Sequence, residues 1–269
     1  LGLGTIPFQA EISIPKEKFT LVRDDLTDKP SVIKETYKNL YSVPFCIDIR
    51  DKGIIGIIGG KGKKGAYDVA YNIIAQLAAN NSYTDVKMVF LYNGDRISSD
   101  RWSFARWLPH VWMDDKKTRM VAGNKAEVGD IFYELATMLR MRMENQGSKD
   151  VRPLPHYVIF VEDPTLLEGE LLENYIYNPR PEYGITTIFL AEKYGDLANS
   201  CENIIQNDAG GCQFFHVINE EERSRDLVVE TVSKESLEAL AIRLCDVEIN
   251  AVTGSGEIPD SLDFFEMYS

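Results

Sequence analysis

The amino-acid sequence predicts an α/β fold with a mostly parallel sheet and helices on both faces. Short apolar runs, which are typical of strands, alternate with longer segments whose apolar residues have helical spacing. The runs are apolar on both faces, as expected for strands that are covered on both sides. A glycine-rich loop also stands between one expected strand and one expected helix. With 269 residues, 44% of them hydrophobic, the chain can bury the core of one large domain of this kind.

The expected elements follow one another along the chain. Alternating apolar and polar residues predict a half-exposed strand over 5–15, and helical spacing predicts a helix over 29–40. Two strands joined by a tight turn at 51–53 are expected over 43–58. After the glycine-rich loop, apolar residues recur at the three-to-four spacing of a helix. The remaining predictions are strands over 86–94, 156–163, 184–192 and 212–218, a short element over 201–207, and helices over 128–145 and 233–247.

Charge and composition count against several classes of function. Acidic residues outnumber basic ones by 42 to 29, and the formal net charge of −13 disfavours binding to nucleic acid. The longest apolar runs are less than half as long as a membrane span, so no such span is expected. The four cysteines and three histidines lie far apart, and their spacing predicts neither a metal site nor a disulfide framework.

Residues 59–67 have the layout of a phosphate-binding loop, because they follow an apolar run and precede a helical segment. They are Gly59, Gly60, Lys61, Gly62, Lys63, Lys64, Gly65, Ala66 and Tyr67. Backbone N–H groups of such a loop and of the following helix can bind an anion, and the lysines add positive charge. Weak nucleotide binding is one interpretation, and a tight turn with solvent-exposed lysines is the other.

The residues needed for phosphoryl transfer are missing from this loop. A working loop has the pattern G-x-x-x-x-G-K-[ST], because its lysine reaches the terminal phosphate and its hydroxyl holds magnesium. If the motif starts at Gly60, Ala66 takes the lysine position and Tyr67 the hydroxyl position. If it starts at Gly59, Gly65 and Ala66 take these positions. Neither alignment restores the chemistry.

An acidic pair ends the expected strand at 156–163. Glu162 and Asp163 follow an apolar run, at a place where a carboxylate can hold magnesium through water and polarise an attacking water. The order is Glu-Asp rather than Asp-Glu, and Pro164 comes directly afterwards. Together with the loop about a hundred residues earlier, the pair is the second candidate for a nucleotide site.

Four segments resemble the ATPase-like modules of the FtsK/SpoIIIE superfamily. They are PFCIDIRDKGIIGIIGGKGKKGA, WLPHVW, PHYVIFVEDP and YGITTIFLAEKYGDLANSCENIIQ. The resemblance covers nearly the whole chain and is closest to the membrane-anchored type VII (ESX/WXG100) secretion ATPases of the EssC/EccC family. Within that family the chain is similar to the module that precedes the three recognised ATPase domains. Its start, LGLGTIPF, and its end, SLDFFEMYS, resemble the borders of that module.

The resemblance implies a RecA-like P-loop NTPase fold in which all three signature sites depart from the catalytic pattern. The phosphate loop falls on 60–67, and the acidic strand end falls on Glu162 and Asp163. Ala191 and Glu192 stand where active domains carry Thr-Gln. ATP hydrolysis is therefore not expected of this module, although the parent protein is expected to be an ATPase. No cofactor is expected here, and ATP and magnesium belong to the other ATPase domains of the parent.

The resemblance also implies a role in protein secretion. The module is expected to link the membrane part of a type VII motor to its ATPase domains and to scaffold or regulate them. Expected partners are the neighbouring ATPase domains, the type VII membrane complex and, through the parent, WXG100 substrates, at the cytoplasmic face of the cell membrane. The alternatives are a weakly active nucleotide-binding ATPase module and an FtsK-type DNA translocase module. The acidic charge counts against the second, and no nucleic-acid partner is expected.

Three segments are expected along the chain. Residues 1–52 form a strand and helix extension that packs on the core, residues 53–250 form the ATPase-like module, and residues 251–269 form a linker to the next domain. The chain does not begin with Met and ends on an apolar, aromatic stretch. It is therefore expected to be a piece of a longer protein.

The three tryptophans, Trp102, Trp107 and Trp112, stand within one short stretch. A spacing of five residues cannot align them on one face of a helix or a strand, so they are expected to surround a turn near Pro109. One interpretation is packing in the core. The other is that Trp107, Leu108, Pro109 and Trp112 form a surface that docks a neighbouring domain, because aromatic anchors dominate interfaces.

Overall fold

The computed structural model describes residues 1–7, 13–14, 26, 28–113, 116–144, 153–218 and 223–248. The strands in these ranges are β1 (Gly2–Pro7), β2 (Asn39–Phe45), β3 (Ile54–Ile58), β4 (Val86–Leu91), β5 (Val121–Ala122), β6 (His156–Val161), β7 (Ile185–Ala191), β8 (Asn203–Asp208), β9 (Gly211–His216) and β10 (Arg223–Val229). The α-helices are α1 (Lys29–Thr36), α2 (Ile49–Lys52), α3 (Lys64–Asn80), α4 (Arg96–Arg101), α5 (Lys125–Glu144), α6 (Glu173–Tyr177) and α7 (Lys234–Leu244). Short 3-10 helices are η1 (Lys61–Lys63), η2 (Ser103–Trp107), η3 (Pro109–Val111), η4 (Pro164–Leu167), η5 (Pro181–Tyr183) and η6 (Tyr194–Asp196).

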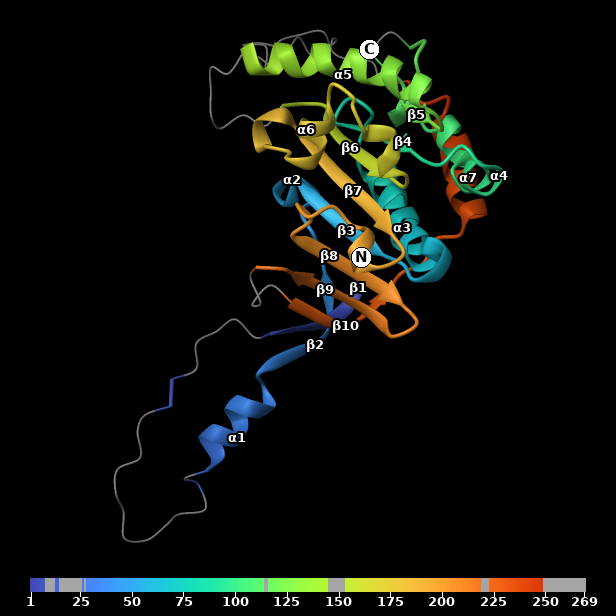
Figure 1. Ribbon diagram of the computed structural model, residues 1–269. Coiled ribbons are helices and arrows are strands. Elements are labelled where there is room, and N and C mark those ends of the chain that lie inside the picture. The colour runs from blue at the N-terminus through green and yellow to red at the C-terminus, as the bar shows by residue number, and fades with distance from the viewer. Residues whose placement is uncertain are drawn as a thin grey trace, which may run out of the picture.

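The strands of the described ranges form one sheet in the order β2-β1-β10-β9-β8-β3-β7-β6-β4-β5 (Figure 1). The part from β5 to β8 is parallel throughout. From β8 to β2 each neighbouring pair is antiparallel. Five of these nine neighbouring pairs are therefore parallel, and the prediction of an α/β fold with a mostly parallel sheet is confirmed.

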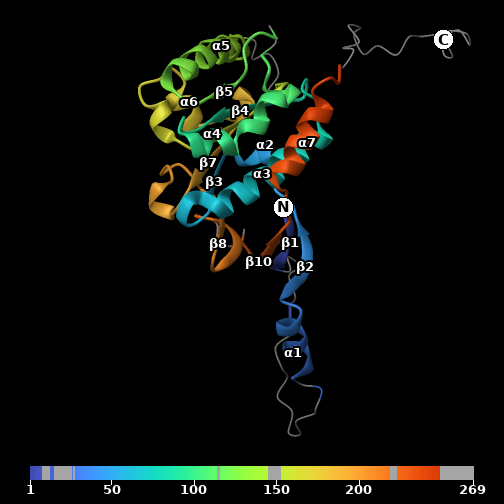
Figure 2. The same cartoon turned by 90° about the vertical axis from the view of Figure 1, so that its right-hand side faces the viewer.

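Two apolar layers cover the parallel part of the sheet. Side chains alternate between the faces of a strand, so Ile55 and Ile57 of β3 pack in one layer with α3 and α7. Ile54 and Ile58 pack in the other layer with α5 and α6. Figure 2 shows α7 on one side of the sheet and α5 and α6 on the other. The prediction of helices on both faces is thus confirmed.

The N-terminal segment extends the sheet beyond β10. β1 pairs with β10, and β2 pairs with β1. Helix α1 lies away from the sheet in both views and buries none of its residues (Figures 1 and 2). The predicted helix over 29–40 ends too late, because Asn39 and Leu40 pair with Pro7 and Ile6 of β1. The predicted strand over 5–15 is confirmed for 5–7, and most of its remainder lies outside the described residues.

Two further predictions need correction or fall outside the described ranges. The expected tight turn at 51–53 is the end of helix α2, whose N-terminus is capped by the Asp48 carboxylate. Gly53 ends that helix with a φ of 59°, a value that favours glycine. The expected linker over 251–269 lies outside the described residues. Among the residues that the structure describes, no helix is both long enough and apolar enough to span a bilayer.

Candidate nucleotide site

The glycine-rich loop joins β3 to α3 at the carboxyl end of a central strand, as predicted. β3 lies between β7 and β8, and both neighbours run parallel to it. The loop requires glycine for reasons of space. A Cβ atom on Gly59 would lie 2.1 Å from the Ala66 nitrogen, and one on Gly65 would lie 1.8 Å from the Asn207 oxygen. Helix α3 can therefore approach the end of β3 closely only with glycine at 59, and β8 only with glycine at 65.

Backbone N–H groups of the loop donate to acceptors within the protein. Gly59 N–H donates to the Ala191 oxygen at 2.9 Å, and Gly60 N–H donates to the Glu192 oxygen at 3.1 Å. Gly62 N–H donates to Glu192 Oε1 at 2.8 Å. In a phosphate loop these groups point at the phosphates instead. Acceptors at the end of β7 therefore accept hydrogen bonds from three N–H groups of the loop.

The lysines of the loop do not gather around one shared site. Lys63 Nζ donates to the backbone oxygen of Glu162 at 2.5 Å. Lys64 Nζ lies 3.8 Å from Asp68 Oδ2, one turn further along α3. Lys61 is exposed to solvent. The contacts of Lys63 and Lys64 thus tie the loop to the end of β6 and to α3.

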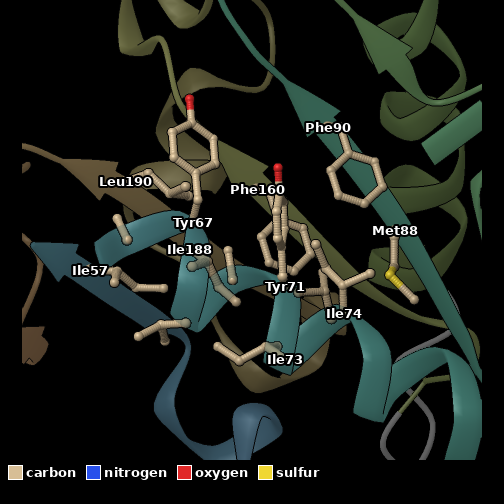
Figure 3. Packing of buried hydrophobic residues seen from close by; sticks show 14 of the residues in the cluster. Ile57, Tyr67, Tyr71, Ile73, Ile74, Met88, Phe90, Phe160, Ile188 and Leu190 are labelled. Atoms are coloured by element: carbon tan, nitrogen blue, oxygen red, sulfur yellow. The ribbon is translucent and has the colours of Figure 1, made fainter. Parts of the chain in front are cut away.

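Ala66 and Tyr67, the residues at the lysine and hydroxyl positions, are both buried. The Tyr67 hydroxyl donates a hydrogen bond to Glu162 Oε1. Burial, together with this hydrogen bond, raises the pKa of the Tyr67 phenol well above its ordinary value. Figure 3 shows the Tyr67 ring beside Leu190, with its oxygen pointing away from the apolar cluster.

Glu162 is the centre of a buried polar cluster. Its side chain is only 5% exposed. Besides Tyr67, Ser98 Oγ donates to Oε1 at 2.8 Å and Trp102 Nε1 donates to Oε2 at 2.7 Å. These three donors come from α3, α4 and the residue that follows α4. We call this set, Glu162 with Tyr67, Ser98 and Trp102, the Glu162 cluster.

Arg101 connects the Glu162 cluster to the loop. Its guanidinium carbon lies 4.3 Å from the centre of the Tyr67 ring, within the range of a cation–π contact. Its Nη1 also donates to the Gly62 oxygen at 3.1 Å. Asp163, the second residue of the acidic pair, points elsewhere and caps η4 through the Thr165 N–H. The structure therefore brings Glu162 to the loop helix but leaves Asp163 out.

The tryptophans surround a turn made of η2 and η3, as predicted. Trp102 is buried in the Glu162 cluster, so the core interpretation is confirmed for this residue. Trp107 is 40% exposed, and Trp112 is half-buried under the Arg119 guanidinium. Leu108 is completely buried, and its assignment to a docking surface is wrong, because its side chain packs in the core with α3.

Three residues that contact Glu162 or the loop were not predicted from the sequence: Ser98, Arg101 and Asn207. Ser98 and Arg101 lie on α4, which was not predicted, although Asp95 three residues before Ser98 is a typical N-cap and does accept its N–H. Asn207 donates its side-chain N–H to the Gly65 oxygen at 3.0 Å. No local pattern indicates that contact. Within the described ranges, no group of three or more His, Cys, Asp and Glu side chains is placed to hold a metal ion.

The parallel part of the sheet carries a glycine-rich loop between a central strand and its helix, and an acidic residue ends another strand, an arrangement found in the RecA-like fold. Solved structures agree. EssC ATPases 2 and 3 from Geobacillus thermodenitrificans match 90% of this chain and 48% of theirs, with a TM-score of 0.54 and 13% identity. A structure described as the cytoplasmic domain of EssC matches 78% of this chain and 47% of its own, with a TM-score of 0.52 and 13% identity.

The chain is homologous to the type VII secretion proteins EssC and EccC. It is 24% identical over 276 residues to EssC of Staphylococcus aureus strain NCTC 8325 / PS 47, an alignment that covers the whole chain. It is 24% identical over 208 residues to EccC of Geobacillus thermodenitrificans strain NG80-2, covering 77% of the chain and 14% of that protein. The chain spans only 18% of the length of the EssC relative. No family model matches it.

Proposed function

We propose that this chain is a catalytically degenerate ATPase-like module of a membrane-anchored type VII secretion motor. In this proposal the module precedes the three ATPase domains, links them to the membrane part, and scaffolds or regulates them. It lies at the cytoplasmic face of the membrane, and its partners are those ATPase domains and the type VII membrane complex. WXG100 substrates are partners of the whole protein. Homology to EssC and EccC supports this placement.

The bonding of Glu162 carries the proposal that the module is inactive. In an active site a strand-end carboxylate holds magnesium through water and orients the attacking water. Here the carboxylate is buried and accepts hydrogen bonds from three side chains of the Glu162 cluster. A carboxylate with this many protein donors holds α3 against the end of β6. The bonding therefore supports a structural role for Glu162.

The loop supports the same proposal independently. Ala66 occupies the lysine position and has no group that can reach a phosphate. Tyr67 occupies the hydroxyl position, and its phenol donates its hydrogen bond to Glu162. Phosphoryl transfer depends mainly on placing positive charge and donors around the terminal phosphate. This loop lacks two of the groups that do so.

Magnesium-dependent ATP hydrolysis by the purified chain tests the proposal. We expect turnover no higher than that of a heat-denatured sample, and the same value for Lys64→Ala. Lys64 is suitable for this comparison because its side chain is exposed, so we expect the fold to survive its removal. Wild-type turnover that disappears in Lys64→Ala would show a weakly active ATPase and contradict the proposal. Tight binding to duplex DNA at low salt would point to a DNA translocase module.

We also propose that Trp107, Pro109 and Trp112 dock a neighbouring ATPase domain. Trp107 is exposed, and Pro109 and Trp112 line a pocket of about 470 Å³. Large aromatic side chains at pockets are typical of interface anchors. We expect Trp107→Ala or Trp112→Ala to weaken binding to the following ATPase domain by about tenfold or more. Tyr194→Ala, an exposed aromatic outside the turn, is the control. Unchanged affinity in both tryptophan variants, with the fold intact, contradicts docking.

A further inference from the structure

Glu192 makes two contacts with the glycine-rich loop, from the residue directly after β7. Its backbone oxygen accepts the Gly60 N–H at 3.1 Å. Its side-chain Oε1 accepts the Gly62 N–H at 2.8 Å. The residues are 130 positions apart in the sequence. The second contact is a charge-assisted hydrogen bond, because a carboxylate accepts from a backbone donor.

The side-chain contact resembles the bond between a phosphate oxygen and a loop N–H group. Both acceptors are anionic oxygens, and both use a backbone donor of a glycine-rich turn. Gly62 has a φ of 70°, so its N–H is presented by a turn conformation that favours glycine. The Glu192 carboxylate therefore satisfies a donor that a phosphate group would otherwise satisfy.

A second carboxylate lies beside the same turn. Asp208 packs against Gly60, where a Cβ atom would lie 3.4 Å from its own Cβ. Hydrogen bonds from Gln206 and from the Gly210 N–H lower the pKa of Asp208 below its ordinary value. Glu192 and Asp208 both line a pocket of about 560 Å³. Lys193 lines the same pocket, but its Nζ lies 3.8 Å from Asp196 Oδ1, so the two carboxylates leave this side of the loop net negative toward an incoming polyphosphate.

We infer that Glu192 is an internal anion that closes the loop to phosphate groups through its contact with Gly62. Because the Glu192 side chain is exposed to solvent, water can replace the Gly62 N–H as its partner. This inference rests on the proposed function, since it concerns how a loop without catalytic residues stays free of nucleotide. It adds that the closure depends on one carboxylate and can be opened by replacing it.

Three variants separate the contributions of charge and hydrogen bond. Glu192→Ala removes both, and Glu192→Gln removes the charge but keeps an acceptor oxygen. Glu182→Ala is the matched control, because Glu182 is exposed and lies just before β7, at the opposite end of the same strand. The probes are inorganic tripolyphosphate and MgATP, titrated by calorimetry at constant ionic strength. Hydrogen exchange of the peptide that covers 59–65 reports on the opening of the loop.

We expect Glu192→Ala to bind tripolyphosphate about tenfold or more tightly than the wild type, as the loss of one charge-assisted bond to an internal competitor implies. Glu192→Gln should lie between the two, and Glu182→Ala should match the wild type. Exchange of the loop peptide should rise in the same order. Glu192→Ala that binds tripolyphosphate no better than Glu182→Ala overturns the inference, whatever the exchange shows. Should Glu192→Ala not fold, Glu192→Gln decides in the same way.

The two proposals fail separately. Hydrolysis of MgATP by the wild type would contradict the proposed function. Unchanged anion binding in an inactive protein would contradict only the role of Glu192.

Discussion

Two glutamates lie at the carboxyl ends of two strands and contact the loop or its helix, but one is buried and the other is exposed. Glu162 follows β6, is buried, and accepts from three side chains. Glu192 follows β7, is exposed, and accepts from one backbone N–H through its side chain. A buried carboxylate depends on all its donors, because water cannot replace a lost one. An exposed carboxylate exchanges its donor with water at little cost. We therefore expect Glu162 to govern stability and Glu192 to govern access.

Replacing Glu162 by Ala should have the largest effect. The change leaves Tyr67, Ser98 and Trp102 without an acceptor in a buried place. We expect the free energy of unfolding to fall by at least about 3 kcal/mol, measured by urea denaturation. Asp163→Ala, which removes a half-exposed cap, is the control and should cost about 1 kcal/mol. A similar loss in both variants would remove the distinction between buried and exposed carboxylates.

Replacing Tyr67 by Phe should have the next largest effect. The ring keeps its packing and its contact with Arg101, and only the hydrogen bond to Glu162 is lost. We expect a loss of about 2 kcal/mol in the free energy of unfolding, typical of a hydrogen bond to a charged group. The measurement is urea denaturation at neutral pH, with Tyr194→Phe as the exposed control. A loss as small as that of the control would mean that Glu162 does not need this donor.

Alkaline pH should reveal the burial of the Tyr67 phenol, together with the same hydrogen bond, through a smaller effect. The pKa of Tyr67 in the folded protein is raised above its ordinary value of 10.0, so the folded state holds the phenol proton more tightly than the unfolded state. The resulting stability is complete well below pH 10 and falls as the pH rises further, by roughly 1.4 kcal/mol near pH 11. Tyr71, whose pKa burial also raises, contributes equally in the wild type and in Tyr67→Phe. Denaturation curves at pH 8 and about pH 11 should therefore show a smaller loss in Tyr67→Phe, and equal losses would contradict this assignment.

Replacing Glu192 by Ala should change stability least. Substitutions of exposed side chains usually stay within about 0.5 kcal/mol, and the Gly62 N–H can bond to water instead. We expect the denaturation midpoint to match that of Glu182→Ala. A loss comparable to that of Tyr67→Phe would show that the contact holds the loop in place, and the contrast between the two glutamates would then disappear.

Local patterns in the sequence predicted the parts of the fold that depend on near neighbours. The strand, loop and helix around 54–80 are correct, because apolar periodicity and glycine spacing act over a few residues. The predicted helix over 29–40 was too long because the pairing of β2 with β1 overrides helical spacing at 39–40. Such pairing joins distant segments, and composition carries no sign of it.

The site shows the same limit more clearly. Glu162 and Tyr67 were identified from the sequence as two separate departures from the catalytic pattern. Their hydrogen bond joins residues 95 positions apart. The contact between Gly62 and Glu192 spans 130 positions and depends on the order of β3 and β7 in the sheet. One of the two interpretations placed Leu108 on a docking surface because its tryptophan neighbours suggested an interface, yet the turn buries it. The loop and the acidic strand end were predictable, whereas the hydrogen bonds that join them were not.

Gly59 and Gly65 are required by the protein's own backbone, since any side chain there would collide with Ala66 or Asn207. Selection for correct folding alone is enough to keep glycine at both positions, whether or not the loop binds phosphate. Glycine spacing in a chain of this kind therefore records the geometry of a strand-to-helix junction. The two residues that follow the last glycine, Ala66 and Tyr67 in this chain, record whether the junction still serves a nucleotide. Searches that weigh the glycines most heavily will group such junctions together whether or not they bind nucleotide, and weighting the next two positions will separate the two kinds.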